Sequence, residues 1–228
     1  MIKIGHRGAM GYEPENTLRS IKKALEQNVD MVEFDVQALK DGEIILMHDD
    51  TLDRTTNGHG FVAEKTLKEI KKLDAGKGEK VPTLQEALDV IDKKVPVIIE
   101  MTGFLTTASL VSDVISHNVK NNNWKYKDIM VSSFIHPELM LFREYLPQIK
   151  IGANISAIPV SYARFAQEIG VDFVATENLY LKDDKFVKDA QARGLEMYLY
   201  SVDDPYYLQR YEEFGIDGVF SNKPDKII

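Results

Sequence analysis

The feature that most constrains the fold is a regular alternation of strand-like and helix-like segments over residues 83–220. The strand-like segments are short and apolar, and they cover 95–101, 129–134, 149–154, 172–176, 196–202 and 218–220. Segments with apolar residues at helical spacing cover 83–92, 105–117, 137–146, 160–169, 183–193 and 205–214. Such alternation is typical of a parallel α/β sheet, because each parallel connection needs a crossover.

The N-terminal part adds three candidate strands. A short strand at 2–5 precedes a helix that begins near Leu18, for which Asn16 is a suitable N-cap. Strands at 31–37 and 44–47 follow, and their connection is too short for a helical crossover. These two strands form either a hairpin or a pair joined by an extended segment.

Nine candidate strands exceed by one the eight of a closed (β/α)8 barrel, so one strand is expected to be peripheral. A chain of 228 residues lies within the size range of a single barrel domain. Residues 49–80 are rich in Asp, Thr, Asn and Gly, with one helix near 65–73, which is typical of an insertion. The sequence therefore predicts one (β/α)8 barrel domain over residues 1–228, with a small insertion after the third strand.

The strand at 31–37 carries two acidic residues on one face. Glu33 and Asp35 alternate with three large apolar residues, so the carboxylates share one side of the strand. In a half-buried strand this side would face water. If both faces were buried, the two carboxylates would need a cation, because an unpaired buried charge is too costly.

Polar and charged residues recur at the ends of the predicted strands. They are His6, Arg7, Glu33, Asp35, His48, Asp49, Glu100, Ser132, Ser133, Glu177 and Ser201. In a (β/α)8 barrel the carboxyl ends of the strands carry the active site. Glu100 shares the inward face of its strand with Ile98, so three inward carboxylates are expected to form a site for a hard divalent cation, Mg2+ or Ca2+.

Two histidines at strand ends suggest acid–base catalysis, because histidine exchanges its proton near neutral pH. His6 and His48 are the candidates, although a single strand-end histidine is more often a structural residue. Arg7 offers a forked donor for a phosphate oxygen, and Tyr200 at its strand end is expected in the pocket. The remaining histidines are expected to be solvated; they are His59, His117 and His136.

Composition narrows the possible partners. With 28 basic and 36 acidic residues the net charge is -8, which disfavours nucleic acid as a partner. The chain has no cysteine, so disulfides and thiolate sites are excluded. It shows no signal-peptide pattern and no apolar run of membrane-spanning length, so a cytoplasmic location without stable membrane insertion is expected. Nothing in the sequence indicates the oligomeric state.

An ordered set of motifs resembles the glycerophosphodiester phosphodiesterase family over nearly the whole chain. The set is His6-Arg7-Gly8, Pro14-Glu-Asn-Thr17, Glu33-x-Asp35, His48-Asp49, Thr51-Leu-Asp-Arg-Thr-Thr-Asn-Gly58, Pro82-Thr-Leu-Gln-Glu86, Glu100, Ser133-Phe134, Tyr200-Ser-Val-Asp203 and Gly215-Ile-Asp-Gly218. The resemblance implies a TIM barrel that hydrolyses glycerophosphodiesters, such as glycerophosphocholine, to glycerol 3-phosphate and an alcohol.

The resemblance also implies roles for individual residues. It implies Glu33, Asp35 and Glu100 as metal ligands, His6 and His48 as the acid–base pair, Arg7 as a phosphate contact and Glu15 as a supporting group.

One single position and two short segments depart from the family pattern. Thr102 stands where the family usually has a lysine, and it becomes a candidate substrate contact with a hydroxyl in place of a charge. The segment 200–203 reads Tyr-Ser-Val-Asp where Trp-Thr-Val-Asn is usual, and 221–224 reads Ser-Asn-Lys-Pro where Thr-Asp-x-Pro is usual. The metal and histidine positions are intact, so the expected reaction is unchanged and the preference for the alcohol group is the open point.

Two other functions fit the same residues less well. A related phospholipase would let a substrate hydroxyl attack and leave a cyclic phosphate, but the chain shows no evident apolar lid or basic membrane patch. A barrel that only binds phosphodiesters would not need a pair of proton-transferring histidines.

Overall fold

The computed structural model describes residues 1–103 and 107–227. Its strands are β1 (Ile2–Gly5), β2 (Met31–Ala38), β3 (Ile44–Leu46), β4 (Val97–Met101), β5 (Ile129–Ser133), β6 (Lys150–Ile155), β7 (Phe173–Glu177), β8 (Glu196–Tyr200) and β9 (Gly218–Ser221). Its α-helices are α1 (Leu18–Glu26), α2 (Leu67–Ile70), α3 (Leu84–Ile91), α4 (Thr107–Asn121), α5 (His136–Tyr145), α6 (Arg164–Glu168), α7 (Lys185–Ala192) and α8 (Leu208–Phe214).

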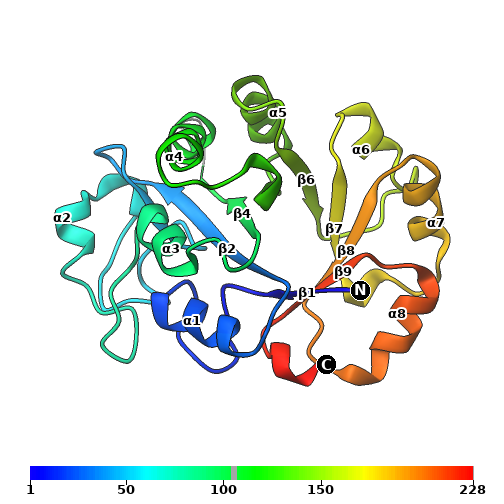
Figure 1. Cartoon of the computed structure of the whole chain (residues 1–228), viewed down its shortest axis with the longest axis horizontal. Helices are drawn as coiled ribbons and strands as arrows, with labels where there is room; N and C mark the ends of the chain where they lie inside the picture. Colours follow the sequence, from blue (N-terminus) through cyan, green and yellow to red (C-terminus); the bar gives the residue numbers. More distant parts are fainter. Residues whose placement is uncertain (104–106, 228) are drawn as a thin grey trace.

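Eight parallel strands close into a barrel. The sheet runs β1-β9-β8-β7-β6-β5-β4-β2-β3, and a further pairing between β1 and β2 joins its ends. Most of the helices surround the strands on the outside, as Figure 1 shows. The predicted (β/α)8 TIM barrel is confirmed.

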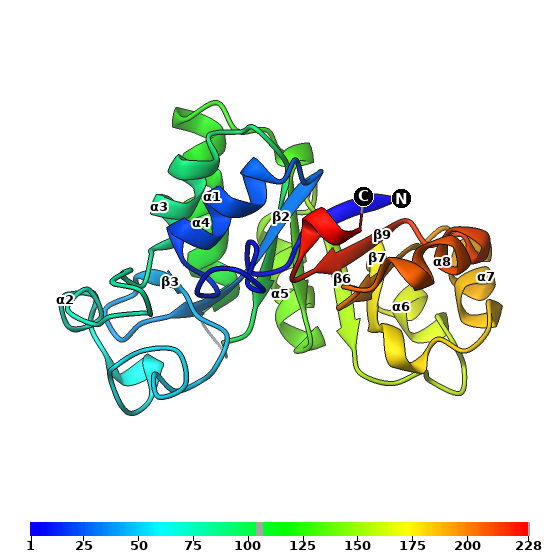
Figure 2. The same cartoon turned by 90° about the horizontal axis from the view of Figure 1, so that it is seen from below.

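The pairing of β3 resolves the alternatives left open for residues 31–47. β3 pairs antiparallel with β2, with Val36 opposite Leu46 and Ala38 opposite Ile44, so the two strands form a hairpin. β3 is therefore the peripheral strand expected from the count. It lies beside the insertion, which projects from one end of the barrel in Figure 2. The insertion packs against the hairpin in a small apolar cluster of Leu39, Ile45, Met47, Leu52, Val62, Ile70, Ala75 and Val81.

Strand parity divides the main core into two layers. Val32, Phe34 and Val36 of β2 pack toward the helices in the larger cluster. The smaller cluster fills the barrel interior with Ile4, Met31, Ile98, Met130, Phe173, Ala175, Tyr198 and Phe220. Close packing requires glycine at position 152, because a Cβ on Gly152 would lie 1.9 Å from the Phe173 ring. Both faces of β2 are thus buried, and its acidic side points into the barrel.

Two helices begin well after their predicted first residues. α6 begins at Arg164 rather than at residue 160, because Tyr162 has a positive φ of 48° that interrupts a right-handed helix. α8 begins at Leu208, after a 3₁₀ turn at Pro205–Tyr207. The predicted start of the helix at 105–117 lies outside the described residues, and the described part of α4 begins at Thr107.

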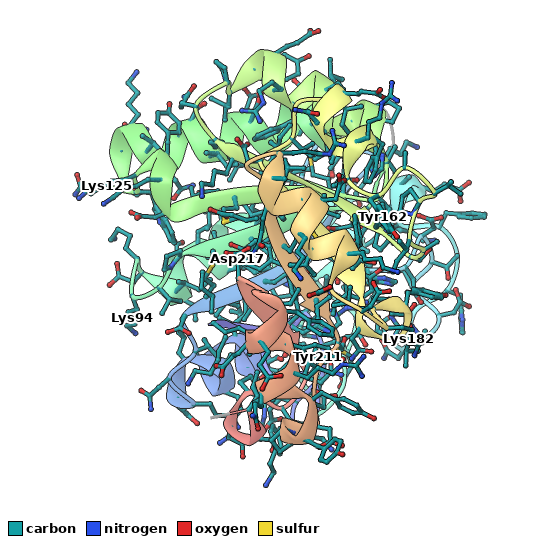
Figure 3. All side chains as sticks on the ribbon, turned by 90° about the vertical axis from the view of Figure 1, so that its right-hand side faces the viewer. Lys94, Lys125, Tyr162, Lys182, Tyr211 and Asp217 are labelled. Atoms are coloured by element: carbon teal, nitrogen blue, oxygen red, sulfur yellow. The ribbon has the colours of Figure 1, made fainter. Side chains whose placement is uncertain are left out.

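The two ends of the barrel are separated in the side view of Figure 3. Lys94 and Lys125, in the loops that enter β4 and β5, lie at one edge, while Tyr162 and Lys182, in the loops that leave β6 and β7, lie at the other. The insertion also lies at this second end, which is the carboxyl end of the strands. Among the described helices, none combines the length and the apolar character needed to cross a bilayer.

Candidate active site

A cavity of about 250 Å3 opens at the carboxyl end of the barrel. Its lining brings together residues from both ends of the sequence: His6, Arg7, His48, Glu100, Phe134, Asn154, Ala175, Tyr200, Ser201 and Phe220. A larger cavity of about 550 Å3 lies beside Gln37, Lys40 and Phe61. The described residues that line it include none of the predicted metal ligands and neither His6 nor His48, so the smaller cavity is the candidate active site.

Three carboxylates cluster at this end. One oxygen each from Glu33, Asp35 and Glu100 lies within 4.8 Å of the others. The strand register explains the arrangement, because Asp35 on β2 lies directly opposite Glu100 on β4. Glu33 Oε1 is buried and has no hydrogen-bond partner among the described residues. Hard oxygen donors with an unused, buried oxygen fit a divalent cation such as Mg2+ or Ca2+.

The negative charges of the cluster repel one another when no cation is bound. Burial raises the pKa of Glu33 well above its usual range, and the charges of Asp35 and Glu100 raise it further. Burial and the charge of Asp35 raise the pKa of Glu100 to about 8. These three groups cannot all be ionised near neutral pH at low cost unless positive charge is added.

Arg7 lies in a turn that ties β1 to the carboxylates. Its φ of 49° is in the left-handed region, and its backbone N–H donates to Glu33 Oε2 at 2.9 Å. Its guanidinium lies 3.1 Å from Asp35 Oδ2 and 2.7 Å from Glu15 Oε1. The next residue has to be glycine, because Gly8 has a φ of +79° and a Cβ there would lie 2.5 Å from Ser20.

His6 is oriented by a chain of polar side chains from the segments that follow β8 and β9. Its Nδ1 lies 2.7 Å from Asn222 Oδ1 and 3.2 Å from Ser201 Oγ. Asn222 Nδ2 donates to Asp203 Oδ2 at 2.7 Å. Asp203 and Asn222 are two of the departures from the family pattern, and they contact each other. Burial lowers the pKa of His6, as does the charge of Arg7, and the hydrogen bond to Asn222 opposes this shift.

His48 has a charged partner instead. Its Nδ1 lies 2.6 Å from Asp49 Oδ1, and its side chain is partly exposed at the rim of the cavity. Asp49 also accepts from Arg54 Nε at 2.6 Å. The hydrogen bond from Arg54 lowers the pKa of Asp49, although partial burial opposes this, so Asp49 is ionised at neutral pH.

The hydroxyl groups of Thr102 and Tyr200 donate to backbone carbonyls. Thr102 Oγ1 donates toward the carbonyls of Val36 at 3.2 Å and Met47 at 3.3 Å, and Thr102 is not among the described residues of the cavity wall. β4 ends at Met101, so the strand parity that predicted an inward Thr102 no longer applies there. Tyr200 lines the cavity as expected, and its hydroxyl donates to the Ile155 carbonyl at 2.8 Å.

The other residues singled out in the sequence lie elsewhere. Glu15 lies behind Arg7 and does not line the cavity. His59 is exposed beside Asp53, and His117 is exposed on α4. His136 stacks on Phe165 with 5.7 Å between the ring centroids.

Two asparagines belong to the site although their roles there were not predicted from the sequence. Asn16 was expected to cap α1, but Thr17 is the N-cap, and Asn16 holds Asp35 instead. Its Nδ2 donates to Asp35 Oδ2 at 2.8 Å, and its Oδ1 accepts from the Asp35 backbone N–H at 3.2 Å. Asn154 at the end of β6 is buried, with its Oδ1 unpaired among the described residues. A lone asparagine in a loop or at a strand end does not indicate such a role.

The fold and the site define the chain as a (β/α)8-barrel enzyme. The model of the glycerophosphoryl diester phosphodiesterase family matches residues 6–226, so the chain belongs to this family of phosphoric diester hydrolases. The chain is 32% identical to the putative glycerophosphodiester phosphodiesterase YhdW of Bacillus subtilis, covering all of this chain and 97% of that protein. It is 33% identical to a glycerophosphodiester phosphodiesterase of Caldanaerobacter subterraneus, covering 100% and 96% of the two chains.

A solved structure is similar over the whole fold. The Oleispira antarctica phosphodiesterase, in complex with its product sn-glycerol-3-phosphate, superimposes with a TM-score of 0.88 at 31% identity. The match covers 100% of this chain and 95% of that one.

Proposed function

We propose that the chain hydrolyses glycerophosphodiesters to sn-glycerol 3-phosphate and an alcohol, with a divalent cation and two histidines. The observation that carries this proposal is the convergence of the buried carboxylate cluster with His6, Arg7 and His48 around one cavity. The product in the Oleispira antarctica relative supports the choice of substrate class.

Glu33, Asp35 and Glu100 would hold the cation, Mg2+ or Ca2+. When bound, such an ion neutralises charge on a phosphoryl oxygen and orients the reacting groups. Arg7 lines the same cavity and can donate to a second phosphate oxygen, while Glu15 and Asp35 fix its guanidinium.

The partners of the two histidines support different roles. The carboxylate of Asp203 can only accept, so the amide nitrogen of Asn222 faces it and the amide oxygen faces His6. His6 therefore carries its proton on Nδ1 and offers the Nε2 lone pair, which suits a general base that takes a proton from water. The water oxygen then bonds to phosphorus.

His48 suits the general acid. Asp49 is an anionic partner at Nδ1 that fixes the ring and would stabilise the proton donor during the reaction. The bond between phosphorus and the alcohol oxygen breaks, and His48 Nε2 delivers the proton that the leaving oxygen needs. In this scheme the hydroxyl of Thr102 has a structural role, because it bonds to the backbone carbonyls of Val36 and Met47. Arg7 and the divalent cation then compensate the charge on the phosphate.

Phosphorus NMR on glycerophosphocholine with added Mg2+ or Ca2+ tests the proposal. We expect a new monoester signal with the chemical shift of glycerol 3-phosphate, and loss of turnover on exhaustive chelation. In water labelled with oxygen-18, the label should enter the phosphate. An accumulating cyclic ester would point to attack by a substrate hydroxyl, and an unchanged diester signal with all metals would contradict hydrolysis of this substrate.

A further inference from the structure

Arg54, in the insertion, makes two bidentate ion pairs at the edge of the site. Its Nε and Nη2 lie 2.6 and 2.8 Å from the two carboxylate oxygens of Asp49. Its Nη1 lies 2.8 Å from Glu15 Oε2, and its Nη2 lies 2.8 Å from Glu15 Oε1. One planar guanidinium therefore fixes the orientation of two carboxylates at once.

Each of these carboxylates also contacts a residue of the cavity wall. Asp49 Oδ1 accepts from Arg54 and lies 2.6 Å from His48 Nδ1. Glu15 Oε1 accepts from Arg54 and from Arg7 Nη1, the latter at 2.7 Å. A continuous chain of charged contacts thus runs from His48 through Arg54 to Arg7.

The charge balance makes Arg54 necessary to this chain. Asp49 and Glu15 would repel each other if they met without a cation between them. Among the described residues, Arg54 is the only lysine or arginine paired with Asp49. The side chain of Arg54 is 47% exposed, whereas that of Glu15 is 11% exposed. Arg54 therefore contributes little to the hydrophobic core, and its contacts point to the site.

We propose that Arg54 is a positioning residue that aligns His48 through Asp49 and Arg7 through Glu15. The inference rests on the proposed function, because it assigns Arg54 to the alignment of the acid and of the phosphate contact. It also connects the insertion to the site. β1 leads into Arg7 and the segment after β3 supplies His48, and the guanidinium of Arg54 in the insertion links the two through Glu15 and Asp49. A lysine could not replace Arg54 fully, because an ammonium group cannot make both bidentate pairs.

Kinetics of Arg54→Met on glycerophosphocholine test the proposal. We expect kcat to fall by about 10- to 100-fold, as for other partners that orient the groups of a site, with a smaller change in KM. Arg54→Lys should lie between the wild type and Arg54→Met. The matched control is Arg19→Met, because Arg19 is 49% exposed and pairs with Glu13 at 2.6 Å. The control should keep kcat within about twofold.

A double-mutant cycle separates positioning from a general effect on the fold. If Arg54 acts partly through Asp49, Arg54→Met should reduce kcat less in the Asp49→Asn background than in the wild type, and the remaining loss should pass through Glu15 and Arg7. Losses that multiply would overturn the link through Asp49. A fall in the melting temperature of Arg54→Met well beyond that of Arg19→Met would mean a structural role instead.

Proton NMR gives a readout that does not need activity. A His48 Nδ1–H bonded to a fixed carboxylate should give a slowly exchanging low-field signal, assigned by its loss in His48→Gln. We expect Arg54→Met to broaden or remove this signal and Arg19→Met to retain it. If the wild type turned over no glycerophosphodiester, the proposed function would fail while this signal still tested Arg54. A signal unchanged in Arg54→Met, with kcat within twofold of the wild type, would overturn the positioning role.

Discussion

Replacing Glu100 by glutamine should stabilise the metal-free protein and remove its response to divalent cations. The reason is the pKa of Glu100, which burial and the charge of Asp35 raise from 4.5 to about 8. A carboxyl group with a raised pKa in the folded chain contributes its full stability below about pH 4.5. This contribution is lost as the pH rises through about 8. Glutamine stays neutral at every pH and avoids the loss.

The magnitude follows from the size of the shift. At pH 7 the solution is about 2.5 units above the ordinary pKa of a glutamate, and each unit corresponds to about 1.4 kcal/mol, so the upper limit is about 3.5 kcal/mol. Glu100 is partly accessible from the cavity, and solvent screening reduces this figure. We expect a gain of about 1–3 kcal/mol, which raises the melting temperature by about 3–10 °C for a chain of this size.

Thermal unfolding between pH 5 and 8, with chelator or with a divalent cation, measures both effects. The metal-free wild type should lose stability as the pH rises and gain about 3 kcal/mol from a cation at 100 times its Kd. Glu100→Gln should show a weaker pH dependence and no gain from the cation. Glu177→Gln, at the carboxyl end of β7 but outside the cluster, is the control and should keep the wild-type response. A metal-free Glu100→Gln protein that melts below the wild type at pH 8 would refute the reasoning.

His6→Ala and His48→Ala should each reduce kcat/KM by about a hundredfold or more and remove one limb of its pH profile, whereas the exposed His117→Ala should change neither. Comparable damage from His117→Ala, with His48→Ala active, would show that the pair is assigned wrongly. Arg7→Ala should raise KM and lower kcat together, because the guanidinium has ion-pair partners in the site and lines the cavity. Thr102→Val should lower the free energy of unfolding by about 1 kcal/mol and leave KM within about twofold, because the hydroxyl contacts backbone carbonyls. A tenfold rise in its KM would instead assign that hydroxyl to the substrate.

Local patterns were sufficient for the architecture and for the centre of the site. The alternation of Glu33 and Asp35 with apolar residues set their shared face, because side chains on a strand alternate with a period of two. Glu100 was found by the same parity on β4. His6 and His48 could be expected near these carboxylates, because the carboxyl ends of barrel strands meet at one end of the fold.

Tertiary structure alone decided the contacts that orient these groups. His6 and Asn222 are separated by 216 positions in the sequence, and Glu15 and Arg54 by 39. The closing of the barrel and the folding of the insertion bring these pairs together, and no local periodicity encodes such contacts. The contacts of the Thr102 hydroxyl with the carbonyls of Val36 and Met47 could not be foreseen either, because strand parity holds only while the chain is extended and β4 ends one residue earlier. The sequence thus determined which acidic, basic and histidine side chains form the site. Their orientation depends on contacts between residues far apart in the sequence, which form only when the barrel closes.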